Sequence, residues 1–370
     1  MRIVIAPDKF KGCLPADAVA RHIAAGLRRR HPAAELDLCP LADGGEGFVD
    51  AMLAATGGTR RVSRVVGPLG DGKIDAVWGM LTGGTAVVEM SGASGFALVP
   101  ESLRNPMNTT TFGTGQLLLA AVQAGATRIL LGIGGSATVD AGLGCCQAAG
   151  HTVLRLDGEP VTPGEPLLGR DLAKIHSIKR GRGSLLDRIP ITVACDVDNP
   201  LSGERGAAVV FGPQKGATPE QVAWFDAQHR ALAGRCLKLD EAATPGAGAA
   251  GGLGWALLSF FTAELVPGID LVISATQLRE RLRGADLCVT GEGAFDGQSA
   301  GGKTASGVAR LCRELGVPCA LLAGHISADT AATFAHAVEV SPRNMPPPEA
   351  FSRAGELLEK AAESLPGQRA

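Results

Sequence analysis

The sequence lacks tyrosine, and aromatic residues make up only 4% of its 370 residues. Aromatic platforms for stacked bases are therefore scarce, which argues against binding of single-stranded nucleic acid. Positive charge is not in excess either, because 35 basic and 37 acidic residues give a formal net charge of -2. A polyanionic partner is not expected from this balance, and any anion site must be local.

Long apolar runs are absent as well. No stretch approaches the roughly 18 apolar residues of a membrane span, and the apolar run within residues 1–8 is too short for a signal peptide. The nine cysteines form no C-x-x-C pair and no spacing typical of a disulfide framework or a zinc site. These features predict reduced core thiols in a soluble, cytoplasmic protein with neither membrane nor nucleic-acid partners.

What the chain has is a large apolar fraction, 45%, and 51 glycines. Strands and helices alternate near both ends, whereas residues 62–66, 74–81 and 86–90 are predicted strands separated by glycine-rich turns. We predict an α/β protein with two α/β domains. Residues 1–65 and 262–370 would form a Rossmann- or flavodoxin-like parallel-sheet domain, residues 66–261 an inserted mixed-sheet domain, and the active-site cleft would lie between them.

The segment 286–309 combines a short apolar run, several glycines and charged residues. Residues 287–289 are typical of a buried strand, Gly291 and Gly293 are expected to end it, and a helix is predicted from Thr304. The polar groups then fall at the carboxyl end of a strand and the amino end of a helix. In open α/β sheets that edge binds ligands, and helix N-termini favour anions.

Three charged residues of this segment are candidate ligand-binding groups. Glu292 and Asp296 could bind a divalent cation, and Lys303 could meet a phosphate as a compact cation. Residues 297–304 also satisfy the pattern G-x-x-x-x-G-K-[ST], but residues 291–296 intervene between the predicted strand and the first glycine of the pattern. A true phosphate-binding loop follows its strand directly, so this match is treated as chance.

Further charged or glycine-rich loops follow predicted strands elsewhere. Their candidate residues are Asp8, Lys9 and Lys11; Asp43 and Glu46; Gly134, Gly135, Ser136, Thr138 and Asp140; Asp196 and Asp198; and Lys215. Asp43 and Glu46 could also cap a helix, and Asp196 and Asp198 could belong to a structural turn. Carboxylates, lysines and exposed backbone N–H groups together suit phosphoryl transfer, which depends on positioning, a metal ion and charge neutralisation.

Two other function classes remain open from the residues alone. Residues 132–137 fit G-x-G-x-x-[GA] after a predicted strand, and Asp157 follows about 20 residues later, as in a dinucleotide-binding fold. That pattern would suit an NAD-dependent hydroxy-acid dehydrogenase. A non-catalytic two-domain protein that binds a small molecule is the second alternative.

Six motifs occur together in one order, at residues 7–12, 42–47, 134–138, 194–200, 211–217 and 290–293, the last followed by Gly302 and Lys303. In these motifs the sequence resembles the bacterial type I glycerate kinases. The resemblance implies a two-domain α/β fold unrelated to P-loop kinases, ATP with Mg²⁺, and phosphorylation of D-glycerate, commonly at the 2-hydroxyl. Lys9 stands where a serine is expected and Ala294 where an arginine is usual, so Lys9 is a candidate for the missing cation.

With this resemblance, we predict in-line attack of a glycerate hydroxyl on the γ-phosphorus of ATP, with 2-phosphoglycerate favoured over 3-phosphoglycerate. The predicted catalytic residues are Asp196, as base or orienting group, with Lys11 and Lys303 as clamps. Predicted substrate-binding residues are Lys9, Asp43, Glu46 and Asp8. Predicted nucleotide-binding residues are Gly134, Gly135, Ser136, Thr138, Lys215, Glu292 and Gly293, and the metal ligands are Asp198 and Asp296, with Asp43 as the alternative to Asp198. The expected partners are glycerate and ATP, and a homodimer is allowed but not required.

Overall fold

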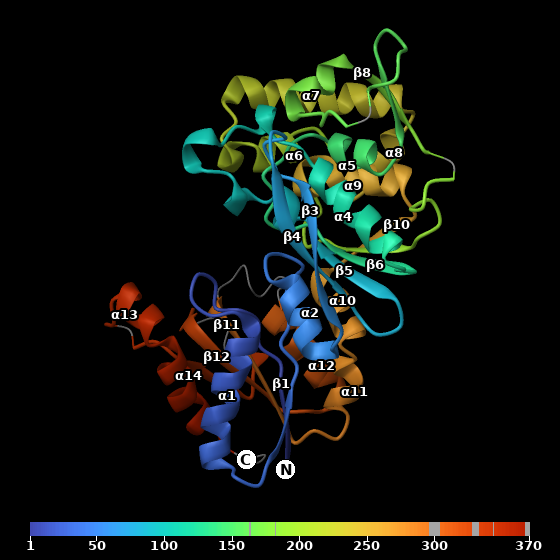
Figure 1. Cartoon of the computed structure of the whole chain (residues 1–370). Coiled ribbons are helices and arrows are strands. Elements are labelled where there is room, and N and C mark those ends of the chain that lie inside the picture. The colour runs from blue at the N-terminus through green and yellow to red at the C-terminus, as the bar shows by residue number, and fades with distance from the viewer. Residues whose placement is uncertain (163, 182, 296–303, 328–332, 343, 367–370) are drawn as a thin grey trace. The chain divides into compact units, whose positions relative to one another are not determined.

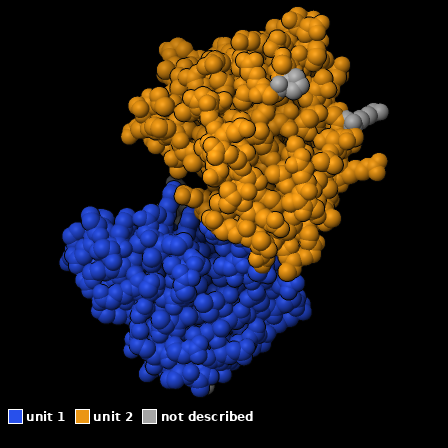
Figure 2. Space-filling model, in the orientation of Figure 1, with its two compact units in different colours: residues 1–43, 50–57, 267–370 blue, residues 44–49, 58–266 orange. Residues whose placement is uncertain are grey.

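The computed structural model describes the chain except residues 163, 182, 296–303, 328–332, 343 and 367–370 (Figure 1). The chain divides into two compact units (Figure 2). Unit 1 consists of Met1–Asp43, Asp50–Gly57 and Pro267–Ala370, and unit 2 of Gly44–Val49 and Gly58–Val266. The chain thus passes from one unit to the other after residues 43, 49, 57 and 266.

The described residues of unit 1 form a parallel sheet with the strand order β13-β12-β11-β1-β2. The strands are β1 Arg2–Ile5, β2 Glu35–Leu38, β11 Leu287–Phe295, β12 Cys319–Ile326 and β13 His336–Glu339. When the five strands are numbered in chain order within the unit and the sheet is read from β2, the order is 2-1-3-4-5, as in flavodoxin-like folds. Such folds bind ligands beyond the carboxyl ends of the strands, at the point where the strand order reverses. In unit 1 that point lies between β1 and β11.

Helices cover this sheet, and the central strands are apolar because both of their faces are buried. The helices are α1 Ala16–Arg30, α2 Phe48–Thr56, α10 Gly268–Ala275, α11 Leu278–Leu282, α12 Thr304–Leu315, α13 Pro347–Ser352 and α14 Ala354–Glu363. Helix α1 packs on α14, so segments from the two ends of the sequence are in contact (Figure 1). His22 and Arg29 of α1 both contact the carboxylate of Glu359, at 2.8 and 2.9 Å.

Strand β11 differs from the sequence prediction. Gly291 and Gly293 do not end the strand: β11 continues to Phe295 and keeps its parallel register with β12. A Cβ atom on Gly291 would lie 2.5 Å from the carbonyl oxygen of Leu322. Glycine therefore lets the backbone of β11 lie close to β12, and here it extends the strand instead of stopping it.

Unit 2 is built on a mixed sheet with the order β10-β9-β6-β5-β4-β3. Its strands are β3 Thr59–Val66, β4 Lys73–Met80, β5 Thr85–Glu89, β6 Arg128–Gly132, β9 Ile191–Ala194 and β10 Ala263–Val266. The pairs from β3 to β5 are antiparallel and those from β5 to β10 are parallel. A separate hairpin pairs β7 Thr152–Arg155 with β8 Ile175–Lys179. The predicted strands at 62–66, 74–81 and 86–90 are confirmed, as is the fold class of one parallel-sheet and one mixed-sheet α/β domain.

The helices of unit 2 surround a core of Leu, Val, Ile and Ala with a few large aromatic residues. They are α3 Ser91–Ser94, α4 Phe112–Gln123, α5 Leu143–Ala148, α6 Ala207–Phe211, α7 Pro219–Arg235, α8 Leu239–Ala243 and α9 Ala249–Phe260, with short 3-10 turns η1 Phe96–Leu98, η2 Glu101–Leu103, η3 Pro106–Asn108, η4 Gly169–Lys174 and η5 Pro213–Lys215. In the described part of the chain, no helix has both the length and the apolar character needed to cross a membrane.

Candidate active site

The first polar cluster lies at the strand-order reversal of unit 1. We call Asp8, Lys9, Lys11, Asp43 and Glu292 the unit 1 cluster. After β1 the chain stays beside its neighbours, because the Asp8 N–H donates to the Gly291 carbonyl oxygen at 2.8 Å and the Leu41 N–H to that of Pro7 at 2.8 Å. All five residues line one cavity of about 800 Å³, a volume typical of small-molecule sites.

Asp8 is the buried carboxyl group of the cluster, with 7% of its surface exposed. Its Oδ2 accepts a hydrogen bond of 2.6 Å from the Thr304 hydroxyl at the start of α12, and its Oδ1 accepts one of 2.7 Å from the Lys9 N–H. Burial, and secondly the nearby Asp43 carboxylate, raise the pKa of Asp8 to about 6. Asp8 can therefore change its charge close to neutral pH.

The two lysines supply positive charge to the same cavity. The Lys9 ammonium lies 3.7 Å from the Asp43 carboxylate, and their side chains are 24% and 42% exposed. Lys11 is exposed at the rim. A Cβ atom on Gly293 would lie 3.3 Å from the backbone nitrogen of Lys11, so this glycine lets the loop after β1 lie against β11. Cations beside buried carboxyl groups suit a ligand that carries both a carboxylate or phosphate and hydroxyl groups.

Another part of the cavity lining is largely apolar. Met345, Pro347 and Phe351 line it, and a hydrogen bond of 2.8 Å joins the His325 Nδ1 to the Glu339 carboxylate at its side. Sequence analysis did not find Met345, Pro347 and Phe351, because no motif marks the segment that carries them. Thr304 was predicted only as the start of a helix, and its bond to Asp8 joins positions 296 residues apart.

The second polar cluster lies after β6 in unit 2, and we call Gly134, Gly135, Ser136, Thr138 and Lys215 the unit 2 cluster. The Lys215 ammonium donates to the Ser136 hydroxyl and to the Thr138 carbonyl oxygen, each at 2.7 Å. Lys215 is only 4% exposed, and its burial lowers its pKa to about 7. A lysine held in this way fixes the shape of the loop from Gly134 to Thr138.

Asp140 anchors the end of the same loop to Thr111 and Gly144. It is fully buried, and its Oδ2 accepts hydrogen bonds from the N–H and the hydroxyl of Thr111 at 2.8 and 2.7 Å and from the Gly144 N–H at 3.3 Å. Burial raises the pKa of this carboxyl group, against these hydrogen bonds. Asp140 is saturated with protein donors, so its role is structural.

The two glycines of the unit 2 cluster differ in their surroundings. Gly135 has a φ of +71° and is exposed, a conformation that glycine adopts without strain. The Gly134 N–H donates to the Gly44 carbonyl oxygen at 3.3 Å, and a Cβ on Gly134 would lie 2.8 Å from Gly45. The segment that carries exposed Glu46 therefore lies beside this loop.

Asp196 and Asp198 follow β9 at the same edge of the mixed sheet. Ala194, the last residue of β9, is in register with Gly132 at the end of β6, so the loops after the two strands are neighbours. Asp196 is exposed there. Asp198 accepts an ion-pair hydrogen bond of 2.6 Å from Arg205, which lowers the pKa of this carboxyl group.

The structure thus groups the described candidates into two sets. Asp8, Lys9, Lys11, Asp43, Glu292 and Gly293 share the cavity of unit 1, whereas Glu46, Gly134, Gly135, Ser136, Thr138, Lys215, Asp196 and Asp198 belong to unit 2. Asp296 and Lys303 lie outside the described residues, as does the pattern match at 297–304 except for Thr304.

The structural context of a dinucleotide-binding loop is missing at residues 132–137. Such a loop opens directly into a helix, but β6 ends at Gly132 and the next helix, α5, begins at Leu143. Asp157 follows β7 in the separate hairpin, not a strand of the main sheet. The dehydrogenase alternative therefore lacks its expected geometry.

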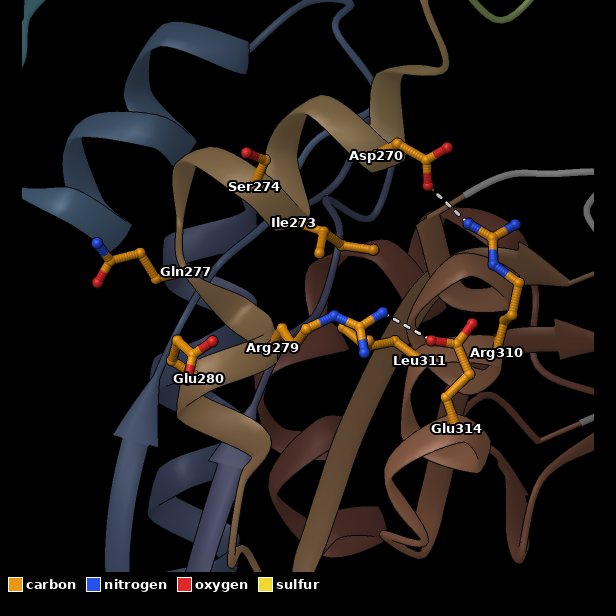
Figure 3. A pocket seen from close by; sticks show the side chains of 9 residues that line it. All are labelled: Asp270, Ile273, Ser274, Gln277, Arg279, Glu280, Arg310, Leu311 and Glu314. Carbon is orange, nitrogen blue, oxygen red and sulfur yellow. Dashed lines mark hydrogen bonds and ion pairs between the residues drawn. The ribbon is translucent and has the colours of Figure 1, made fainter.

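A second cavity, of about 460 Å³, lies among α10, α11 and α12 (Figure 3). Four of its five charged lining residues form two ion pairs, Asp270 with Arg310 and Arg279 with Glu314, each at 2.6 Å (Figure 3), and Glu280 is the fifth. These pairs are about half exposed, so solvent screens them and they contribute little stability. Because both arginines are paired with carboxylates and Glu280 adds a further negative charge, this cavity is a poorer anion site than the unit 1 cluster.

Two α/β units whose strand ends carry carboxylates, lysines and glycine-shaped loops define an enzyme equipped for phosphoryl transfer to a small molecule. A family model described as the glycerate kinase family matches residues 3–368. The chain belongs to the glycerate kinase family, and it is a kinase.

Individual relatives agree with this assignment. The chain is 45% identical to a glycerate kinase of Halalkalibacterium halodurans, with 98% of this chain and 97% of the relative covered. It is 43% identical to a glycerate 2-kinase of Escherichia coli, with 92% and 89% covered. A crystal structure of a putative glycerate kinase 2 from Salmonella typhimurium is similar, with a TM-score of 0.87 at 40% identity and 98% and 96% of the two chains covered. These comparisons give no support to the dehydrogenase or the binding-protein alternative.

Proposed function

We propose that this kinase transfers the γ-phosphoryl group of ATP to D-glycerate in the presence of Mg²⁺, with 2-phosphoglycerate as the favoured product and 3-phosphoglycerate as the alternative. The observation that carries the proposal is the unit 1 cluster, where two lysines and three carboxyl groups line one cavity. Glycerate has one carboxylate, which requires a cation, and two hydroxyls, which require acceptors. The name glycerate 2-kinase, carried by one relative, supports the 2-hydroxyl as the acceptor.

In unit 1, we assign the binding of glycerate to Lys9, Asp43 and Asp8. Lys9 lies within 3.7 Å of Asp43 and 24% of its side chain is exposed, so it can pair with the substrate carboxylate from the cavity wall. Asp8 is held in place by Thr304 and the Lys9 N–H, which orients its oxygens for a substrate hydroxyl. Lys11 at the rim, together with Lys303, would neutralise phosphate charge in the transition state.

In unit 2, we assign the phosphates of ATP to the glycine-rich loop after β6. Exposed Gly135 leaves room for a ligand at the backbone, and Lys215 holds Ser136 and Thr138 in a fixed arrangement. Glu292 and Gly293 of β11 and Glu46 keep the binding roles predicted from the sequence. Asp196 would orient or deprotonate the attacking hydroxyl.

The donor set of unit 1 suits Mg²⁺. This ion prefers oxygen ligands and is usually held by one or two carboxylates together with substrate phosphates and water, and Asp43 and Glu292 both line the cavity. When bound, Mg²⁺ neutralises charge that develops on the transferred phosphoryl group. Asp43 is our candidate ligand among the described residues, with Asp296 as the sequence prediction. Asp198 would have to leave its bond to Arg205 to act as one.

The test is release of ADP from ATP and Mg²⁺ that depends on D-glycerate. We expect Asp196→Asn and Lys303→Ala each to lower turnover by about 100-fold or more, the scale of a lost preorganised charge contact. Asp157→Asn, in an exposed turn of unit 2, is the control and should keep full turnover. Near-normal turnover in both variants would contradict the residue roles, and absence of glycerate-dependent ADP release would contradict the function.

The product can be identified without a coupling enzyme. In a proton-coupled ³¹P spectrum, phosphorus on the 2-oxygen couples to one carbon-bound proton and gives a doublet, whereas phosphorus on the 3-oxygen couples to two and gives a triplet. We expect the doublet. A homodimer and a cytoplasmic location stay predictions from the sequence.

A further inference from the structure

Three buried cysteines converge at the base of the unit 1 sheet, and we call Cys288, Cys312 and Cys319 the cysteine trio. Their sulfur atoms all lie within 4.8 Å of one another. Cys288 belongs to β11, Cys319 to β12 and Cys312 to α12, so three successive elements of the fold each contribute one thiol. Nothing in the proposed kinase reaction uses these residues.

The register of the sheet brings the three sulfurs together. Cys288 and Cys319 are direct partners in the parallel ladder between β11 and β12, so their side chains point to the same face of the sheet. The helix α12 connects these two strands and packs on both of them. Its residue Cys312 is fully buried, and its sulfur completes the trio.

From this convergence we propose that the cysteine trio is a binding site for a soft, thiophilic monovalent metal ion of the Cu(I) type. Soft thiolate sulfur selects Cu(I), Zn²⁺ or iron–sulfur clusters over hard cations. Structural Zn²⁺ requires four ligands, and among the described residues no histidine, carboxylate or fourth cysteine joins this group. Three sulfurs satisfy the lower coordination number of Cu(I).

The balance of charge points to the same ion. When a monovalent ion replaces one thiol proton, R–SH + M⁺ gives R–S–M + H⁺, and the net charge of the buried site does not change. A divalent ion bound in the same exchange would leave a positive charge in an apolar core, which is costly.

All three residues of the trio are buried in the folded protein. Cys288 and Cys312 are fully buried, whereas Cys319 keeps 5% of its surface exposed. An ion would therefore reach the three thiols through a local opening of α12 from the sheet. Bound metal would then join α12 to β11 and β12 in the folded protein.

The test is a competition for Cu(I) under anaerobic, reducing conditions. The whole protein is titrated with Cu(I) in the presence of a colour-forming Cu(I) chelator, and the copper withheld from the chelator is measured. We expect one tightly held ion per chain. Loss of an outer partner of a metal ligand weakens binding about 10- to 100-fold, so loss of a ligand in Cys312→Ala should weaken it by at least about 100-fold.

The matched control is Cys146→Ala, which also removes a fully buried helical cysteine but lies outside the trio. It should hold copper as the wild type does. If Cys312→Ala does not fold, as judged by circular dichroism, Cys319→Ala, which removes a thiol contributed by a different element, takes its place. A wild type that withholds no copper, or trio variants that bind as tightly as the wild type, would overturn the proposal. Copper-edge absorption that shows nitrogen or oxygen ligands would overturn it as well.

Discussion

Replacing Lys215 with methionine should remove a pH dependence from the unfolding of unit 2. Burial lowers the pKa of Lys215 from 10.5 to about 7. Below pH 7 the lysine is protonated in both the folded and the unfolded states, and the cost of its buried charge is fully present. As the pH rises through 7 the folded protein loses this proton while the unfolded chain keeps it, so stability rises with pH.

The magnitude follows from the size of the shift. Each pKa unit corresponds to about 1.36 kcal/mol, so the shift from 10.5 to about 7 corresponds to roughly 5 kcal/mol in total. Integrated only from pH 7 to pH 9, the wild type should gain roughly 2 kcal/mol relative to Lys215→Met. The variant also loses the hydrogen bonds to Ser136 and Thr138, but that loss adds a constant offset and no slope.

Tryptophan fluorescence is a selective probe for this experiment. The chain has three tryptophans, and all of them, Trp78, Trp224 and Trp255, belong to unit 2. Urea unfolding would be followed at pH 7, 8 and 9 for the wild type, for Lys215→Met and for the control Lys179→Met, which removes an exposed lysine of the same unit. Equal pH slopes for the wild type and Lys215→Met would refute the reasoning.

Three further predictions concern other residues. The pKa of Asp8 is raised from 3.8 to about 6 in the folded protein, so the wild type should lose roughly 3 kcal/mol of stability as the pH rises from 3.8 through 6. Calorimetry should show that Asp8→Asn abolishes this fall. Equal slopes of stability against pH for the wild type and Asp8→Asn would contradict the prediction. Lys9→Ala should raise the KM for glycerate more than it lowers kcat, and an unchanged KM would remove Lys9 from substrate binding. Gly291→Ala should destabilise the protein by about 1–3 kcal/mol, because its Cβ would lie 2.5 Å from the Leu322 oxygen. Gly72→Ala, where a Cβ meets nothing within 4 Å, is the control for Gly291→Ala in thermal unfolding, and equal losses would contradict the steric argument.

The positions of the polar loops could be predicted because each follows a short apolar strand in the sequence. Asp8 and Asp43 were placed after β1 and β2 in this way, and parallel pairing of those strands brings both residues to one edge of the sheet. The extension of β11 could not be predicted from glycine content alone. Gly291 ends no strand here because its neighbour Leu322 supplies a close backbone partner, and that contact appears only when the sheet forms.

Contacts across long sequence distances explain the remaining differences. The pKa of Lys215 depends on burial against a loop 77 residues earlier in the chain, and no local pattern shows that burial. The apolar wall of the unit 1 cavity comes from the segment around Met345 and Phe351, which carries no recognisable motif. The cysteine trio was predicted only as separate core thiols, because the pairing of β11 with β12 sets the distance between its sulfurs.

The pairing of Ile3 in β1 with Leu287 in β11 has a consequence for folding during synthesis. β1 leaves the ribosome before unit 2, but its partner on one side, β11, is translated only after the whole of unit 2. Unit 2 can therefore fold as a nascent domain while the first strands of unit 1 wait, with one edge of β1 unpaired. Chaperone binding to ribosome-bound chains should accordingly be strongest before β11 emerges and fall once it has been translated.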